Sequence, residues 1–426
     1  MKKPFELTAS EATRAIDAGS LSATALVDSC LERIAEREPQ VEAWTWLDAD
    51  AARARAKSLD SGPRRGPLHG VPFGIKDIID TVDMPTGYGS PIYAGSRPAA
   101  DAACVALTRE AGGVLLGKTV TTEFANLHPG KTRNPHDPSR TPGGSSSGSA
   151  AAVGALMVPL AIGTQTTAST IRPASYCGVY GYRPTWGDLR CSGVREAAGS
   201  LDTLGLMARS IEDIALYRDV LLGQPASPLP PEPRRPRIGF CRTSRWDTLE
   251  PSTAAMLEQA ARTLAAAGAQ VTEIVLPEEF GRVVDAHRWV SSFEFTRNFR
   301  HEIANHADRI STTLREGRIR DGLSCSFERY LESRTFLEQC RLRLPDACSH
   351  VDLLLTASCD GEAPVGLNTT GNPYFSALWT ALHVPCLTAP VFTGPAGLPV
   401  GVQLIGHRNR DRDLLDAARW VVAALA

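Results

Sequence analysis

Short apolar runs bracketed by glycine alternate with helix-periodic segments along this chain, and this alternation restricts the fold more than any other feature. The runs "GVPFGIKDIID" (70–80) and "GGVLLGKTV" (112–120) have the composition of buried strands, and "DAACVALTREA" (101–111) between them repeats apolar residues at helical spacing. The same strand–helix–strand order recurs after residue 236 in "RIGFCR", "PSTAAMLEQAARTLAAAGA" and "QVTEIVLP". Alternation of this kind predicts a mixed α/β core.

Charge and hydropathy exclude several classes of protein. The formal net charge of −2 leaves no electrostatic basis for binding nucleic acid, which a basic face normally supplies. The N-terminal segment turns polar directly after its first lysines, and the longest apolar stretch, 150–162, is too short to span a bilayer and contains Gly154 and Pro159. We therefore expect a cytoplasmic protein with no membrane and no nucleic-acid partner.

The ten cysteines form no recognisable metal or disulfide pattern. They are scattered from Cys30 to Cys386 without a C-x-x-C pair. The segment "HEIANH" (301–306) is one residue too long for the H-E-x-x-H motif of zinc-binding helices. We expect buried, reduced thiols, no metal ion and no cofactor.

Composition also marks segments of different character. Residues 7–60 have helical periodicity in two or three stretches, and residues 280–345 are mostly helical in pattern and rich in arginine. In "QPASPLPPEPRRP" (224–236) six prolines predict a surface connection. Two further strands are predicted by "HVDLLLTAS" and "PVGVQLIG" near the C-terminal end.

The stretch "GGSSSGSAAAV" (143–153) admits several interpretations. A flexible linker fits poorly, because the stretch runs directly into an apolar, helix-like segment. A phosphate loop would need G-x-x-x-x-G-K-[ST], and no lysine follows. The run "GSSSG" does match the G-x-S-x-G nucleophile elbow, which would make Ser146 the nucleophile of an α/β-hydrolase-type esterase, although the preceding "TRNPHDPSRTPGG" is a proline-rich loop rather than a strand.

A fourth interpretation comes from several motifs taken together. "PLHGVPFGIKD", "RNPHDPSRTPGG", "GGSSSGSAAAV", "GTQTTASTIRPAS", "SLDTLGLMARSIEDIAL" and "GLPVGVQLIG" occur in this order, and the chain resembles the amidase signature family over nearly its whole length. The resemblance implies one domain over 1–426, with a central mixed, twisted sheet covered on both faces by helices. Its core is expected at about 60–222, and the second half of the sheet at 237–426, with a helical substrate cover at about 280–345.

The family uses a Ser–cis-Ser–Lys triad, and the matching positions here are Lys76, Ser145 and Ser169. Ser169 corresponds to the nucleophile, and Ser145, whose preceding peptide bond is cis in the family, corresponds to the bridging serine. A serine nucleophile needs a neighbour that accepts its proton, and a lysine serves only when it is neutral. Burial disfavours the ammonium form and lowers a lysine pKa, so the residues in this pattern are chemically consistent.

The resemblance also implies an oxyanion hole made by the backbone N–H groups of Thr166, Thr167, Ala168 and Ser169. The sequence departs from the family here, because Thr167-Ala168 replaces the small Gly-Gly or Ala-Gly pair that usually precedes the nucleophile. Gln165 stands in place of a more usual aspartate. We expect Arg172 to be structural and to pair with a buried carboxylate.

The implied reaction is hydrolysis of C–N bonds in small amides or carbamates, with aryl amides, urethanes and esters as related substrates. Ala125, Asn126 and Gly144 are expected to border the substrate. Trp289, Phe293 and Phe295 are candidate walls on the leaving-group side, with ordinary core packing as the alternative for these three. We expect a monomer or homodimer acting on a small molecule. The alternatives are an amidotransferase A-type subunit, which works with partner subunits, and the Ser146 esterase.

Overall fold

The computed structural model describes residues 2–426, and the eleven strands within them form one sheet. Most of these strands are short apolar runs whose side chains are buried, as expected of strands covered on both faces. Their bounds are β1 (Trp44–Leu47), β2 (Pro72–Lys76), β3 (Val114–Thr119), β4 (Leu160–Gln165), β5 (Tyr180–Arg183), β6 (Thr203–Ala208), β7 (Arg237–Cys241), β8 (Gln270–Ile274), β9 (Leu353–Ala357), β10 (Cys386–Thr393) and β11 (Pro399–Gly406).

The sheet is mixed in direction. The strand order is β1-β3-β2-β4-β6-β5-β10-β11-β9-β7-β8. Strands β3, β2 and β4 run parallel to one another, and so do β9, β7 and β8, whereas the pairs from β4 through to β9 are antiparallel. The two strand–helix–strand units predicted from the sequence therefore lie in the two parallel portions of one sheet, joined by antiparallel strands.

Helices account for most of the remaining structure. The proline-rich connection at 224–236 contains no helix or strand, as its composition predicts. The helices used below also include the 3₁₀ turn η3 (Glu123–Ala125) and the π-helical turn η7 (Arg315–Ile319). The α-helices are α1 (Ala9–Asp17), α2 (Ala23–Val41), α3 (Ala49–Asp60), α4 (Ala103–Glu110), α5 (Ser147–Gly154), α6 (Ile171–Tyr176), α7 (Ile211–Leu221), α8 (Pro251–Ala266), α9 (Val283–Asn298), α10 (Arg300–Asn305), α11 (Thr312–Leu314), α12 (Arg320–Ser324), α13 (Phe327–Cys348), α14 (Tyr374–Ala381) and α15 (Asp411–Leu425).

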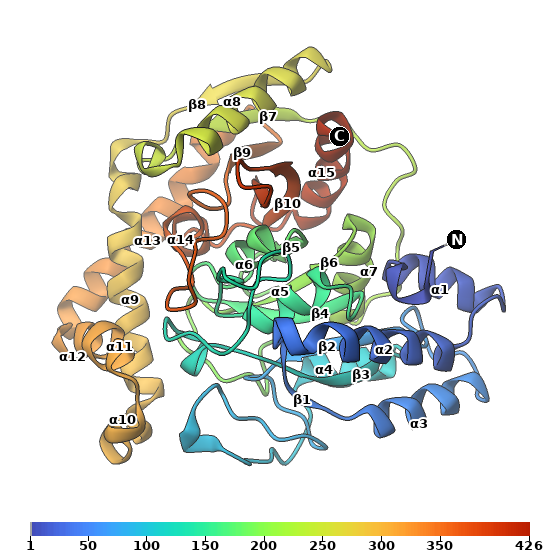
Figure 1. Cartoon of the computed structure of the whole chain (residues 1–426). Helices are drawn as coiled ribbons and strands as arrows, with labels where there is room; N and C mark the ends of the chain where they lie inside the picture. The colour runs from blue at the N-terminus through green and yellow to red at the C-terminus, as the bar shows by residue number, and fades with distance from the viewer. Residues whose placement is uncertain (1) are drawn as a thin grey trace.

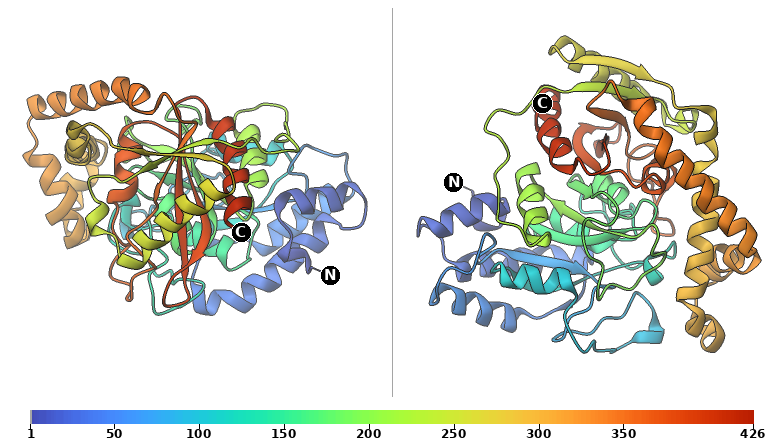
Figure 2. Two further views of the ribbon diagram at one scale, coloured as in Figure 1. Left: turned by 90° about the horizontal axis from the view of Figure 1, so that it is seen from above. Right: turned by 180° about the vertical axis from the view of Figure 1, so that it is seen from behind.

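Helices cover both faces of the sheet, as the resemblance implies. On one face α4, α7, α8 and α15 pack against the sheet in a single apolar cluster. On the other, α2, α3 and α5 cover one half of the sheet and α9, α13 and α14 cover the other half. The helices from α9 to α13 stand as a column at one side of the molecule, and the N-terminal helices α1 to α3 lie at the opposite side (Figure 1, Figure 2).

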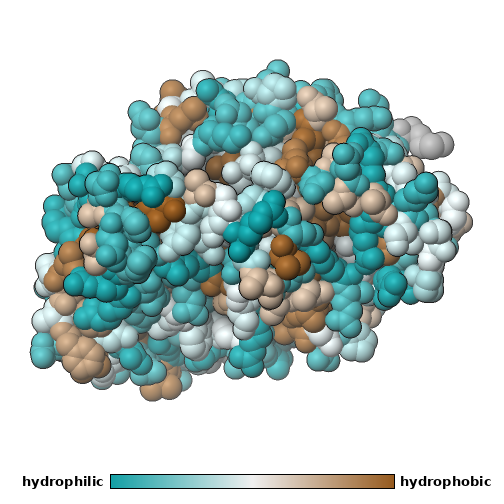
Figure 3. Space-filling view, turned by 90° about the horizontal axis from the view of Figure 1, so that it is seen from below, coloured by the Kyte–Doolittle hydropathy of each residue, from teal (hydrophilic) through white to brown (hydrophobic). Residues whose placement is uncertain are grey.

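Several features of the surface and the thiols agree with the composition. All ten cysteines are free thiols, and nine of them are buried. Within residues 2–426, no helix is both long and apolar enough to cross a bilayer. On the face seen from below, hydrophilic residues predominate and hydrophobic residues lie in small separate patches (Figure 3).

Candidate active site

Lys76 is the last residue of β2, and its side chain is fully buried. Its Nζ donates hydrogen bonds to Ser145 Oγ at 2.7 Å and to Thr164 Oγ1 at 2.8 Å. Burial lowers the pKa of this amine to about 7, and the charge of Asp202 opposes the shift only in part. A substantial fraction of Lys76 is therefore neutral at pH 7, with a lone pair available to accept a proton.

The serine run places each hydroxyl differently. Ser145 receives the Lys76 hydrogen bond. Ser146 is fully buried, and its Oγ donates to the Thr164 carbonyl and accepts from the Thr164 N–H, both at 3.2 Å. Ser147 Oγ donates to the Gly143 carbonyl at 2.9 Å, which ties the first residue of α5 to the loop before the helix. A nucleophile elbow presents its serine to the substrate, and Ser146 is instead tied to the backbone of β4, so this geometry argues against the Ser146 esterase.

The peptide bond between Gly144 and Ser145 is cis, as the resemblance implies. Its carbonyl, on Gly144, accepts a hydrogen bond from Arg172 Nη2 at 2.7 Å. The same guanidinium donates to the Gly371 carbonyl at 2.7 Å and to Thr370 Oγ1 at 3.0 Å. The expected carboxylate partner of Arg172 was wrong, because its partners are backbone carbonyls and a hydroxyl. Arg172 thereby fixes the serine loop against the segment that precedes α14.

Ser169 lies in the loop Thr166–Ser169, between the end of β4 and the start of α6. The Ser146 N–H donates to the Ser169 carbonyl at 3.3 Å, which joins this loop to the serine run. The Ser169 residue is 8% exposed and lines a cavity of about 260 Å³. Lys76, Ser145 and Gly144 do not line this cavity, so Ser169 is the residue of the predicted triad that meets it.

The loop presents several backbone N–H groups without a protein acceptor. Among the described residues, none accepts a hydrogen bond from the N–H of any residue in Thr166–Ser169. The next two N–H groups, of Thr170 and Ile171, donate to Gln165 Oε1 at 2.9 and 3.1 Å. Gln165, which stands in place of the more usual aspartate, thus provides the acceptor at the start of α6. These four N–H groups therefore remain available to an acceptor from outside the protein, which is what the predicted oxyanion hole requires.

Side chains from three other elements hold the first part of this loop. Thr166 Oγ1 donates to Asp202, which precedes β6, and its carbonyl accepts from His287 Nε2 of α9 at 2.8 Å. The Thr167 carbonyl accepts from Thr380 Oγ1 of α14 at 2.8 Å. Burial lowers the pKa of His287 to about 4 and raises that of Asp202 to about 6, so at pH 7 the imidazole is neutral and the carboxylate is charged.

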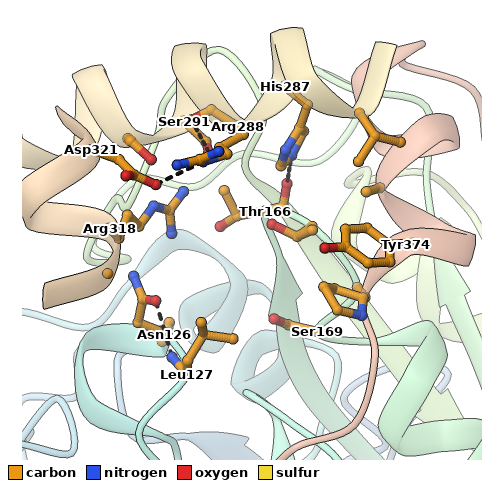
Figure 4. Close-up of a pocket in the computed structure, with 18 of the residues that line it drawn as sticks. Asn126, Leu127, Thr166, Ser169, His287, Arg288, Ser291, Arg318, Asp321 and Tyr374 are labelled. Carbon is orange, nitrogen blue, oxygen red and sulfur yellow. Dashed lines mark hydrogen bonds and ion pairs between the residues drawn. The ribbon is translucent and has the colours of Figure 1, made fainter. Parts of the chain in front are cut away.

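The cavity lies between this loop, α9, the turn η7 and the N-terminal end of α14 (Figure 4). Ala125 and Asn126, expected beside the substrate, both line it, together with Leu127. The lining residues are Ala125–Leu127, Thr166–Ser169, Arg172, Val284, His287, Arg288, Ser291, Ser292, Gly317, Arg318, Asp321, Pro373, Tyr374 and Ala377.

The predicted aromatic walls were wrong. None of the three lines the cavity: Phe293 and Phe295 are buried in apolar clusters, and Trp289 faces a separate surface groove. The face of α9 that lines the cavity instead carries residues spaced three and four apart, from Val284 to Ser291. The helical period of this segment could have identified that face, but nothing in the sequence indicates which face of an amphipathic helix lies over a cavity.

Two charged groups in the cavity differ in their pairing. Arg288 Nε forms an ion pair with Asp321 Oδ2 at 2.7 Å. Arg318 points into the cavity from η7 (Figure 4), and its Nη2 is buried without a hydrogen-bond partner in the described part of the chain. Burial lowers the Arg318 pKa to about 10, which leaves the guanidinium charged at neutral pH.

Comparison with known proteins identifies the family of this chain. The family model described as Amidase matches residues 25–415. The chain is 35% identical to the A-type subunit of glutamyl-tRNA(Gln) amidotransferase from Chloroflexus aggregans, covering 96% of this chain and 94% of that one. It is 32% identical to 2-amino-5-chloromuconic acid deaminase of Comamonas testosteroni, covering 95% and 93%. The crystal structure of the peptide amidase of Stenotrophomonas maltophilia superposes with a TM-score of 0.84 at 29% identity, covering 98% and 96%. The chain therefore belongs to the amidase signature family.

Proposed function

We propose that this protein is an amidohydrolase that cleaves the C–N bond of small amides through an acyl-enzyme on Ser169. One observation carries the proposal: Lys76, whose pKa is lowered to about 7, is hydrogen-bonded to Ser145 next to the loop that bears Ser169. Membership of a family of C–N hydrolases supports the reaction class. We further propose that residues 1–426 act as one catalytic domain, because the described strands share one sheet.

In the proposed mechanism Ser169 Oγ attacks the substrate carbonyl, and its proton passes through the Ser145 hydroxyl to neutral Lys76. The N–H groups of Thr166–Ser169 stabilise the negative charge that develops on the carbonyl oxygen. The relay then returns a proton to the departing nitrogen, which leaves an ester on Ser169. Water hydrolyses this ester with the same groups acting as base and acid.

The unpaired Arg318 favours a substrate that carries a carboxylate at its non-reacting end. The carboxylates whose charges reach Arg318 are Asp202 and Glu294. Asp202 is engaged with Thr166 and two backbone N–H groups, and Glu294 with Ser200 and Tyr330. An incoming anion would therefore meet a cation that no protein carboxylate neutralises directly. Carbamates, aryl amides and esters share the carbonyl geometry and belong in the same substrate panel.

The test is a panel of amides, carbamates and esters with and without a terminal carboxylate. We expect Ser169→Ala to abolish turnover, and Ser145→Ala and Lys76→Ala each to lower kcat by about 10²- to 10⁴-fold or more, because each removes a member of the proton relay. Ser349→Ala, a substitution of an exposed serine at the end of α13, is the matched control. Turnover that survives Ser169→Ala would refute the proposal.

An amidotransferase A-type subunit is the second candidate, because relatives with that name match nearly the full length of the chain. The near-neutral charge and the loop Gln165–Ala168 favour a stand-alone hydrolase. Release of ammonia from glutamine only in the presence of partner subunits would support the second candidate instead. Turnover of small amides by the isolated chain supports the first.

A further inference from the structure

The oxyanion loop of this chain contains no glycine, and two side chains from outside it donate hydrogen bonds to its carbonyls. Thr166–Ser169 are all residues with a side chain, yet their four N–H groups lack protein acceptors among residues 2–426. Glycine usually gives such a loop its conformational freedom. Something other than backbone freedom must therefore aim these N–H groups.

The planarity of the peptide bond indicates which contacts set the direction of these N–H groups. In a trans peptide unit the C=O and the N–H point in opposite directions. The Gly144–Ser145 bond is the cis bond of the described residues, so the units within the loop are trans. The C=O of Thr166 and the N–H of Thr167 belong to one unit, and the C=O of Thr167 and the N–H of Ala168 belong to the next. When a donor fixes the direction of one of these carbonyls, the N–H in the same peptide unit must therefore point away from that donor.

We infer that His287 and Thr380 are positioning residues that aim the N–H groups of Thr167 and Ala168 at the developing oxyanion. His287 Nε2 donates to the Thr166 carbonyl at 2.8 Å, and Thr380 Oγ1 donates to the Thr167 carbonyl at 2.8 Å. The inference rests on the proposed function, because it assigns a task within that reaction. Neither side chain touches the reacting atoms in this role.

The chemical state of each donor fits the task. The partner of His287 is a carbonyl, which only accepts, so the neutral imidazole carries its single proton on Nε2. Thr380 is fully buried, and its Oγ1 accepts from Gln165 Nε2 at 2.9 Å while its own proton goes to the loop. The hydrogen bond that the Thr380 hydroxyl accepts and the one that it donates are therefore both assigned. Figure 4 shows His287 reaching down from α9 to Thr166, with Ser169 on the far side of this contact.

The two donors lie on helices in the C-terminal half of the sequence. His287 is on α9 and Thr380 is on α14, whereas the triad and the loop lie before residue 170. The helical cover would thus have a catalytic consequence besides forming the cavity wall, because its docking completes the oxyanion hole. Variants at these positions should change transition-state stabilisation more than substrate binding.

The experiment compares His287→Leu, which cannot donate, with His287→Gln, whose amide N–H can reach the same carbonyl. Thr380→Val and Thr380→Ser form the corresponding pair. For the hydrolysis of a 4-nitroanilide we expect His287→Leu and Thr380→Val each to lower kcat by about 10- to 100-fold with KM within about twofold, somewhat less than the loss of an oxyanion donor itself. The rate of inactivation by a fluorophosphonate should fall in parallel, and the Gln and Ser variants should recover most of both rates.

The control is His301→Leu, which removes an exposed histidine of the same helical cover and should change neither rate. Thermal melting of every variant separates lost catalysis from lost folding, and recovery in the Gln and Ser variants does so independently. Three results would overturn the inference: unchanged kcat in the Leu and Val variants, equal losses in the donor and non-donor variants, or a loss confined to KM. A wild-type protein that neither turns over amides nor reacts with the fluorophosphonate would instead refute the proposed function itself.

Discussion

Replacing Lys76 by methionine should lower turnover as strongly as Lys76→Ala does and, at neutral pH, remove the free-energy cost of burying the amine. The Lys76 pKa falls from 10.5 to about 7 on folding. Between these values the unfolded chain binds more protons than the folded one, so the contribution of Lys76 to stability rises as pH rises through this window. The cost of burying Lys76 in neutral form is about 4 kcal/mol at pH 7 and about 2 kcal/mol at pH 9, at about 1.4 kcal/mol per pKa unit.

The assay is urea unfolding of the wild type and Lys76→Met at pH 7 and pH 9. The variant also loses the hydrogen bonds to Ser145 and Thr164, but that loss is nearly the same at both values of pH. Relative to Lys76→Met, the wild type should therefore gain about 2 kcal/mol in free energy of unfolding between pH 7 and pH 9. Lys57→Met, at an exposed position of α3, should show no such change. A difference between wild type and Lys76→Met that is equal at both pH values would refute the lowered pKa.

Three further predictions concern the pH profile, the serine run and the choice of substrate. Because only the neutral Lys76 acts as base, kcat/KM measured against pH should fall about tenfold per unit below pH 7; a flat profile down to pH 5 would contradict the relay. Ser146→Ala should cost about 1 kcal/mol of stability in urea titrations, through its lost bonds to β4, while fluorophosphonate labelling of Ser169 persists; loss of labelling in a folded variant would contradict the structural role. Arg318→Gln should lower the kcat/KM ratio of succinamate to butyramide, measured by ammonia release, by about 10- to 100-fold, and Arg320→Gln should leave that ratio unchanged; equal ratios in wild type and Arg318→Gln would exclude an anion site there.

Local patterns in the sequence predicted β2, β3, β7, β8 and β9 of the parallel portions of the sheet, but not β4. The apolar runs that became β2, β3, β7 and β8 are bracketed by turn residues and separated by helical periodicity, so each element could be identified alone. The short strand β1 was not predicted, because "WTWL" carries no alternation that distinguishes it from the end of the preceding helix. The order of the strands, with β10 between β5 and β11, depends on contacts between distant segments and has no local signal.

Some residues of the candidate site could be predicted from the sequence, and others could be found only in the folded structure. The resemblance could identify the predicted triad because its members, Lys76, Ser145 and Ser169, stand in motifs. In the structure, Lys76 and Ser145 are in contact. His287 and Thr380 stand in no recognised motif, and each contributes through a hydrogen bond to a segment remote in sequence. Thr164 and Asp202 lie within motifs, but those motifs assigned them no role. Gly144, expected beside the substrate, does not line the cavity, and its carbonyl accepts a hydrogen bond from Arg172. Partners of this kind emerge only when the chain is folded.

The most direct test of the account is to treat the protein with a fluorophosphonate, measure its intact mass and map the modified peptide. The account predicts a single adduct on Ser169, absent from Ser169→Ala and slowed in Lys76→Ala, because the nucleophile depends on a neutral lysine. An adduct on Ser146, or one on Ser169 that forms equally fast without Lys76, would contradict the Ser169–Ser145–Lys76 relay.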